Sequence, residues 1–169
     1  MNTPCLSNNR SLFSCLLLAV SCAGISHAQY TRGYVFVAPT AQILAGKTSS
    51  AYAAGGGMER ILRRGFGAGV ELSGILPGTG KANQSVGLAS FNGYYHPVLN
   101  SAWDPYLTAG YSCWFSDFVA NGANFGSGLN YWYNDNRALM VEFRDSTAVK
   151  PGIFTRRHDL QIRIGLTFR

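Results

Sequence analysis

Large apolar residues occupy every second position near the end of the chain. The apolar members are Leu160, Ile162, Ile164, Leu166 and Phe168. Asp159, Gln161, Arg163, Gly165 and Thr167 alternate with them. Side chains of a β-strand point alternately to opposite faces, whereas those of a helix repeat every 3.6 residues. The pattern therefore predicts that residues 158–169 form a strand with one apolar face.

The same alternation recurs along the rest of the chain. It is clear at residues 66–73 and 139–144 and weaker at 87–95, 107–113 and 127–133. Residues 34–41 are apolar at both parities, and residues 51–58 contain three consecutive glycines that weaken strand propensity, so these two strands are predicted by position. Clusters of Pro, Gly, Asn and Asp separate the segments. The sum is eight antiparallel strands, and pairing the first with the last would leave no open edge.

The face opposite the apolar one indicates which side of the sheet is solvated. A water-exposed face would carry many charges, but these positions hold mostly small or polar residues: Gly67, Gly69, Ser73, Ser90, Asn92, Thr108, Gly110, Ser112, Gly126, Gly128 and Asn130. Such residues suit the crowded interior of a narrow barrel. We therefore expect an all-β, eight-stranded, antiparallel up-and-down transmembrane β-barrel, with its apolar face turned toward lipid.

A few charged residues share the polar face, namely Glu71, Glu142, Arg144, Asp159 and Arg163. Buried ions are costly unless they are paired. If the last two strands are symmetric about Gly152, Arg144 lies near Asp159, and Glu142 lies near Gln161 and Arg163. The sequence thus predicts an interior network of ion pairs. Because each acid has a basic neighbour, this pattern favours a structural role over acid–base catalysis by paired carboxylates.

Composition supports a surface that is not covered by water alone. Charged residues make up 13% of the chain, about half the ~25% of an average soluble domain, and aromatic residues also make up 13%. The net charge is +6, but no basic run is interleaved with aromatics, so we expect no nucleic-acid partner. No cluster of metal-ligating or cofactor-binding residues stands out, and we expect no cofactor.

The beginning of the chain has the features of an export signal. Arg10 precedes an apolar run from Leu12 to Ala23, and Ser26-His27-Ala28 has the small-x-small form of a cleavage site. The apolar run is shorter than the ~20 residues that a membrane-spanning helix needs. We expect residues 1–28 to be a cleaved signal peptide and residues 29–169 to be the barrel, with Cys113 as its one cysteine.

Several aromatic residues fall near the predicted strand ends, where amphipathic rings suit a membrane interface. We expect these residues to form an aromatic girdle: Tyr34, Tyr95, Trp103, Tyr106, Trp114 and Tyr133.

With these patterns, the chain resembles the small outer-membrane β-barrels, which include OmpA-type and OmpX-type barrels and opacity-type surface proteins. The resemblance rests on residues 125–131, 139–144 and 160–168. It implies a non-catalytic outer-membrane protein of a Gram-negative cell envelope, with short extracellular loops and an interior filled by side chains. It also implies contact with outer-membrane lipid and lipopolysaccharide, for which the loop residues Lys150, Arg156 and Arg157 are candidates.

The resemblance further implies recognition by the outer-membrane assembly machinery. Family members usually end on an aromatic residue that this machinery reads. In this chain the expected assembly-signal strand carries Leu160, Ile162, Ile164, Leu166 and Phe168, and Arg169 follows the aromatic residue.

Two other functions are compatible with the sequence. Some eight-stranded barrels are enzymes that modify lipopolysaccharide, and a triad of His158, Asp145 and Ser146 can be drawn near the outer end of the last two strands. A secreted lipocalin-like barrel, with the apolar face turned inward around a small ligand, is the other alternative.

Overall fold

The computed structural model describes residues 30–44, 46–78, 85–116, 119–149 and 156–169. Within them lie eight strands and one short 3-10 turn. The elements are β1 (Tyr30–Leu44), β2 (Lys47–Ile61), η1 (Arg63–Gly65), β3 (Phe66–Pro77), β4 (Val86–Tyr95), β5 (Trp103–Phe115), β6 (Val119–Asn134), β7 (Arg137–Val149) and β8 (Arg156–Phe168). The predicted signal peptide lies outside the described residues.

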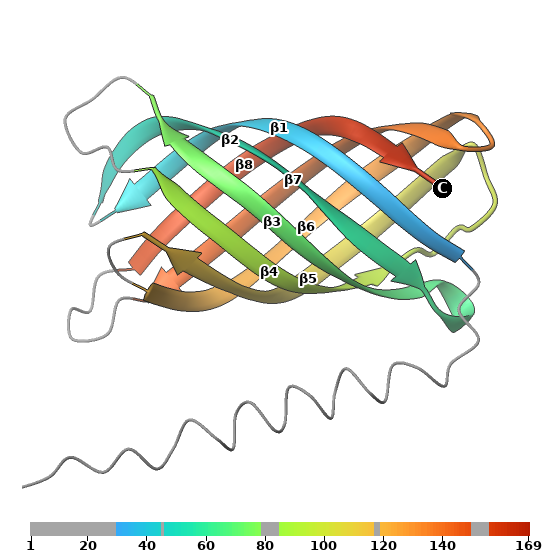
Figure 1. Cartoon of the computed structure of the whole chain (residues 1–169), viewed down its shortest axis with the longest axis horizontal. Coiled ribbons are helices and arrows are strands. Elements are labelled where there is room, and N and C mark those ends of the chain that lie inside the picture. The colour runs from blue at the N-terminus through green and yellow to red at the C-terminus, as the bar shows by residue number, and fades with distance from the viewer. Residues whose placement is uncertain (1–29, 45, 79–84, 117–118, 150–155) are drawn as a thin grey trace, which may run out of the picture.

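The strands form a closed barrel in which each strand pairs antiparallel with the next and β1 pairs with β8 (Figure 1). One end of the barrel, which we call the terminal end, holds Tyr30, Arg169 and the turns at 62–65, 96–102 and 135–136. The opposite end is called the far end. The predicted eight-stranded antiparallel barrel is therefore confirmed.

The β1–β8 junction that closes the barrel is interrupted at Pro39. Residues 33–37 and 40–44 of β1 pair with β8, whereas Ala38 and Pro39 do not, although both pair with β2. Proline has no N–H to donate, so the gap in hydrogen bonding falls on the β8 side of this residue.

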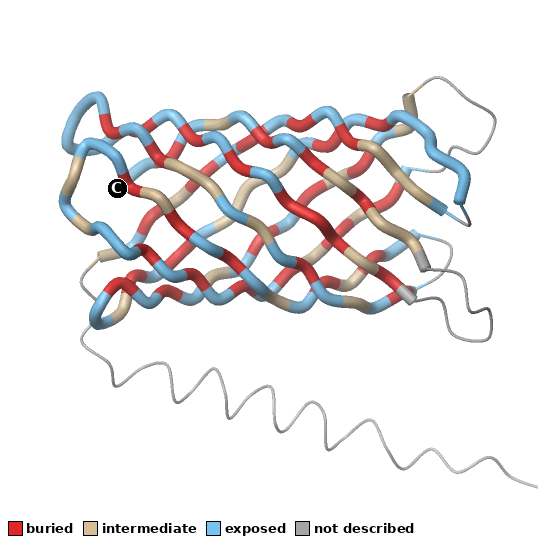
Figure 2. Tube along the Cα trace, turned by 180° about the vertical axis from the view of Figure 1, so that it is seen from behind, coloured by how far each residue is buried: buried red, intermediate tan, exposed pale blue. Residues whose placement is uncertain are grey.

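Burial alternates along every strand, so that red and blue segments follow one another in Figure 2. Large apolar residues point outward, among them Val37, Leu72, Leu107, Phe125 and Ile164, each more than half exposed. Charged and polar residues point inward, and Arg144, Arg163 and Asp159 are at most 1% exposed. This distribution is the inverse of that in a soluble protein, as the small residues of the polar face predicted.

The strand that contains Gly55, Gly56 and Gly57 is the full-length β2, although its propensity is weak. A Cβ on Gly57 would collide with the ring and hydroxyl of Tyr34, which lies opposite in the barrel interior. Glycine is needed here because the Tyr34 ring occupies the space. β6 begins at Val119, and Ala120 is buried inside the barrel.

Within the described residues, no helix has the length and apolar character to cross a membrane.

Candidate functional site: the charged barrel interior

Four buried charges meet midway along the barrel. We call this group the central cluster: Glu71 from β3, Glu142 and Arg144 from β7, and Arg163 from β8. Arg163 Nη1 is 2.8 Å from Glu71 Oε2 and 3.3 Å from Glu142 Oε1. Arg144 Nε is 2.6 Å from Glu142 Oε1, and its Nη1 is 3.2 Å from Glu71 Oε2. Two positive and two negative charges therefore balance away from water.

A tyrosine hydroxyl also bonds to one oxygen of each carboxylate. Tyr34 donates to Glu71 Oε2 at 2.9 Å, and Tyr106 donates to Glu142 Oε2 at 2.7 Å. A Cβ on Gly128 would collide with the Tyr106 ring, so this inward-facing glycine makes room for it. Hydrogen bonds to the lone pairs of buried carboxylates lower the cost of burying their charge, and each tyrosine supplies one such bond. Among the described residues, Glu71 Oε1 and Glu142 Oε1 have no hydrogen-bond partner.

Asp159 does not pair with Arg144 as predicted. The β7–β8 register places Glu142 opposite Arg163 but Arg144 opposite Gln161, so that Asp159 lies opposite Ser146, one inward position farther along. Its partners are instead Arg157 Nε, at 3.0 Å from both carboxylate oxygens, and Trp114 Nε1, at 3.0 Å. The true centre of the β7–β8 pairing lies between residues 152 and 153 and not at Gly152. Because only every second residue points inward, this small error moves the predicted partner of Asp159 by one inward position.

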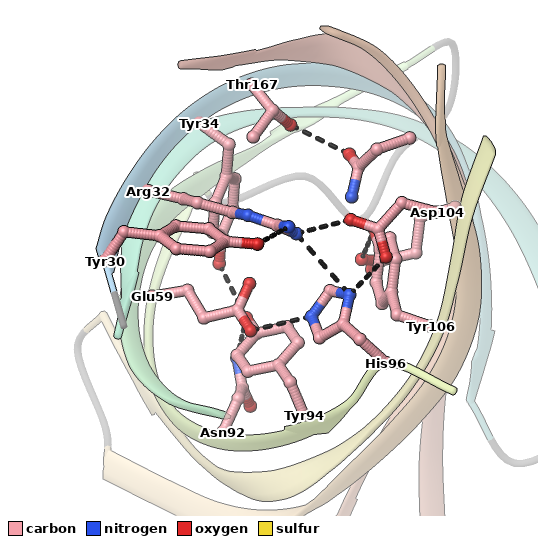
Figure 3. Close-up of polar contacts among 12 residues, drawn as sticks. Tyr30, Arg32, Tyr34, Glu59, Asn92, Tyr94, His96, Asp104, Tyr106 and Thr167 are labelled. Atoms are coloured by element: carbon pink, nitrogen blue, oxygen red, sulfur yellow. Dashed lines mark hydrogen bonds and ion pairs between the residues drawn. The ribbon is translucent and has the colours of Figure 1, made fainter. Parts of the chain in front are cut away.

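A second group of buried charges lies at the terminal end and was not predicted. We call this group the end cluster (Figure 3): Arg32 of β1, Glu59 of β2, Asp104 of β5, and His96 just after β4. Arg32 Nη1 donates to Asp104 Oδ2 at 2.6 Å. His96 lies between the two acids, with Nδ1 2.7 Å from Asp104 Oδ1 and Nε2 2.8 Å from Glu59 Oε1.

The geometry of the end cluster favours a protonated His96. Carboxylate oxygens face both ring nitrogens, and only the imidazolium form has an N–H on each of them to donate. Burial alone would lower the pKa of His96, but the hydrogen bonds and charges of Asp104 and Glu59 outweigh it and raise the pKa above its ordinary value. With His96 charged, the end cluster holds two positive and two negative groups.

Sequence signals for the end cluster were present in part. Asp104 has the same parity as Thr108, which the alternation placed inside, so its inward direction follows from the pattern. Arg32 precedes the segment that is apolar at both parities, and Glu59 follows the glycine run, so neither had a clear face. His96 lies beyond the end of β4, where alternation gives no information.

Little space remains between the two clusters. A cavity of about 10 Å³ is lined by side chains that include Tyr34, Glu59, Tyr106 and Glu142. That volume is about the minimum for one water molecule. Farther toward the far end, Ser112 bonds to Ser90 and Asn124, each at 2.8 Å. Side chains therefore leave little space at this level of the barrel.

The remaining predicted residues have various positions. Ile162, Ile164, Leu166 and Phe168 of the expected assembly strand point outward and are exposed, and Leu160 is half-buried. Lys150 lies outside the described residues, and Arg156 begins β8. Arg157 pairs with Asp159, so its side chain is turned toward the barrel interior and not toward an external phosphate.

The drawn triad is not assembled. His158 Nδ1 lies 3.1 Å from Asp145 Oδ2. Ser146, however, is adjacent to Asp145 in the same strand and points inward, where it is 1% exposed, so its hydroxyl lies on the opposite face of the barrel wall. The described residues also contain no group of three or more His, Cys, Asp or Glu side chains arranged to hold a metal ion.

The expected aromatic girdle is half correct. Tyr95, Trp103 and Tyr133 are exposed at the terminal end, where Trp103 also packs against Tyr131 with ring centroids 4.7 Å apart. The prediction was wrong for the other three residues, because Tyr34, Tyr106 and Trp114 are at most 6% exposed and point into the barrel. Their parity matches that of interior residues on the same strands, so nearness to a strand end was a weaker guide than alternation.

Comparisons with known proteins identify the fold. No family model matches the chain, and no curated protein matches it by sequence. The solved structure of Neisserial surface protein A aligns with a TM-score of 0.69 at 14% identity, covering 82% of this chain and 96% of that one. OprG from Pseudomonas aeruginosa aligns with a TM-score of 0.55 at 14% identity, covering 85% and 97%. The N-terminal β-barrel domain of OprF from the same organism aligns with a TM-score of 0.53 at 16% identity, covering 80% and 96%. The chain therefore has the fold of the small eight-stranded outer-membrane β-barrels.

Proposed function

We propose that the protein is a non-catalytic outer-membrane β-barrel that holds short loops at the surface of a Gram-negative-type cell. The observation that carries this proposal is the inverted distribution of side chains. Outward positions on the eight strands are mostly apolar, while the interior holds the central and end clusters. An outer wall of exposed apolar side chains is favourable only where the surroundings are less polar than water, and a lipid bilayer meets that condition.

The filled interior supports a structural or surface-interaction role over transport. Eight strands enclose little more than their own side chains, and ion pairs cross the lumen at two levels in this barrel. General porin activity would require both clusters to move aside. A lipocalin-like function fits poorly as well, because the lumen is lined by charges and not by an apolar ligand cavity.

The partners that this proposal implies are outer-membrane lipid, lipopolysaccharide and the outer-membrane assembly machinery. Export would depend on residues 1–28 as a signal peptide. The exposed apolar row of Ile162, Ile164, Leu166 and Phe168 supports β8 as the strand that the assembly machinery reads. Lys150 and Arg156 remain candidates for contact with lipopolysaccharide phosphates, and this is a weaker proposal because Arg157 is engaged by Asp159.

Cell fractionation combined with gel mobility tests the proposal. We expect the protein in the detergent-extracted outer-membrane fraction, with a band that shifts in mobility on boiling because the closed barrel resists the detergent until it is heated. Recovery from the periplasm or medium without detergent would contradict it. In planar bilayers the purified protein should show no sustained conductance, and a stable open channel would refute the filled interior.

The enzymatic alternative is tested separately, by mass spectrometry of lipid A. We expect the same lipid profile with and without the gene, and an altered profile that a His158→Ala variant fails to restore would favour the enzyme.

A further inference from the structure

A shallow groove crosses the outer wall of the barrel near the terminal end. It has a volume of about 320 Å³, and its outward-facing residues come from three adjacent strands: Phe66 of β3, Gly93 and Tyr95 of β4, and Leu107 and Ala109 of β5. Phe66 and Tyr95 pack together with ring centroids 5.0 Å apart, and Gly93 lies opposite Ala109 in the β4–β5 register. Small residues on neighbouring strands thus form a hollow bordered by rings and a leucine.

Three arginines lie beside this groove. Arg63 and Arg64 are exposed on η1, the turn that runs directly into Phe66. Arg60 is exposed on β2 and lies opposite Ala68, two residues after Phe66 on β3. The turn is fixed to the end of β4, because His96 N donates to Gly65 O at 2.8 Å. The turn that carries Arg63 and Arg64 is therefore held next to Phe66 at the edge of the groove.

No acidic side chain offsets these arginines on the outer wall. Between residues 46 and 102 the sequence contains two acids, Glu59 and Glu71. Both point inward, where Glu59 pairs with His96 and Glu71 pairs with Arg144 and Arg163. The outer surface next to the groove is consequently cationic without compensation, which is an electrostatic match for a phosphate-bearing headgroup.

We propose that this groove binds an anionic phospholipid of the membrane leaflet at the terminal end. One acyl chain lies over Gly93 and Ala109 between the Phe66–Tyr95 ring pair and Leu107, and the phosphate meets Arg63 and Arg64, with Arg60 beside them. The inference rests on the proposed membrane location. It goes further than the proposed function because it names the class of lipid and the residues that contact its acyl chain and its headgroup.

Gly93 offers a way to fill the groove without disturbing the barrel wall. A Cβ at this position would meet no heavy atom closer than Ala109 O at 3.7 Å, so a larger side chain extends outward into the groove. Gly74 is the matched control, because it also faces outward and a Cβ there meets nothing within 4 Å, but it lies in β3 away from the groove. For the charges, the exposed Arg137 at the start of β7 is the control at the same end.

The experiment is native mass spectrometry of the detergent-purified protein titrated with either dioleoyl phosphatidylglycerol or dioleoyl phosphatidylcholine. We expect the wild type to retain the anionic lipid more strongly. Each Arg→Gln change at Arg63 or Arg64 should weaken retention of phosphatidylglycerol about fivefold and leave phosphatidylcholine unchanged. Gly93→Leu should weaken retention of both lipids, whereas Gly74→Leu and Arg137→Gln should behave as the wild type.

Two results would overturn the site: equal retention of the two lipids by the wild type, or retention in Gly93→Leu and Arg63→Gln/Arg64→Gln that matches the wild type. Heat-shifted gel mobility of each variant in detergent verifies that it is folded. A protein that is absent from the membrane fraction refutes the proposed function, whereas a membrane-inserted barrel that shows no lipid preference refutes only this inference.

Discussion

The central and end clusters solve the same electrostatic problem with different chemistry. Each balances two positive and two negative groups inside the barrel. The central cluster uses Arg144 and Arg163, whose guanidinium groups stay protonated, and all four members lie within strands. The end cluster relies on His96, which titrates and lies in the turn after β4. The comparison teaches that charge balance is permanent in the middle of the barrel and depends on a single proton at its terminal end.

The largest effect should come from removing a permanent charge. Arg163→Met leaves Glu71 and Glu142 with Arg144 as their one buried cation, and we expect a loss of about 4 to 5 kcal/mol in the free energy of unfolding. Urea unfolding in phospholipid vesicles, followed by fluorescence, measures it. Glu71→Gln added to Arg163→Met should recover part of the loss, since it removes an unpaired carboxylate. A loss below about 1 kcal/mol would show that the central cluster contributes no more than a solvent-exposed ion pair.

Removing the titratable cation should cost less. His96→Gln keeps polar contacts but leaves Glu59 and Asp104 with one buried cation, Arg32, and we expect a loss of about 3 kcal/mol near neutral pH, measured by the same unfolding experiment. His158→Gln is the matched control, because His158 also faces a carboxylate but is partly exposed, so its loss should stay below about 1 kcal/mol. Equal losses for the two histidines would contradict the special position of His96.

The dependence on pH separates the clusters most directly. His96 has a pKa raised above its ordinary value in the folded state, so its stabilising contribution is complete below the unfolded-state pKa, about 6.5, and is lost as the pH rises through the folded-state pKa. We expect the stability of the wild type to fall over this window. Unfolding curves of His96→Gln should lack this component, while Arg163→Met should retain it. A wild-type curve that rises with pH would invert the assignment.

The smallest expected effect concerns Arg169, which extends the end cluster toward its open rim. Its guanidinium carbon lies 3.9 Å from the Trp132 ring centroid and 4.7 Å from that of Tyr30, and Arg32 contacts the same two rings. Arg169→Gln should lower stability by about 0.5 to 1 kcal/mol. Arg137→Gln, at the neighbouring turn, serves as the reference and should have no measurable effect. Membrane insertion of Arg169→Gln, compared by fractionation, tests whether the residue after Phe168 affects assembly.

Alternation alone predicted the architecture because the barrel wall separates two environments with a period of two. The eight strands and the inward direction of Glu71, Glu142, Arg144 and Arg163 all follow from it. Alternation does not predict which residue each charge pairs with, since the register depends on the turn between two strands. A small shift in register moves each residue opposite a different partner. Asp159 illustrates this, because it pairs with Arg157 and not with Arg144.

Alternation could not predict the end cluster, for a different reason. Its members come from β1, β2, β5 and the turn after β4, so their meeting depends on barrel closure and not on any local pattern. Glu59 and His96 are 37 residues apart, and Arg32 and Asp104 are 72 apart. The likeness to small outer-membrane barrels does not help either, since it specifies the wall and not the side chains that fill it.

Pro39 has a consequence for the order in which the barrel assembles. The β1–β8 junction joins residues from nearly opposite ends of the described chain, so closing it carries the largest loss of chain entropy, and the missing hydrogen bond at Pro39 gives it less enthalpy in return. We expect this junction to form last in folding and to open first in unfolding. Both arginines that neutralise the central cluster lie in β7 and β8, and Arg163 stands in the interrupted part of the junction. Glu142 and both arginines belong to the β7–β8 pair, whereas Glu71 of β3 meets the arginines across the lumen. We therefore expect the neutralisation of Glu71 to be an event of the final closing step.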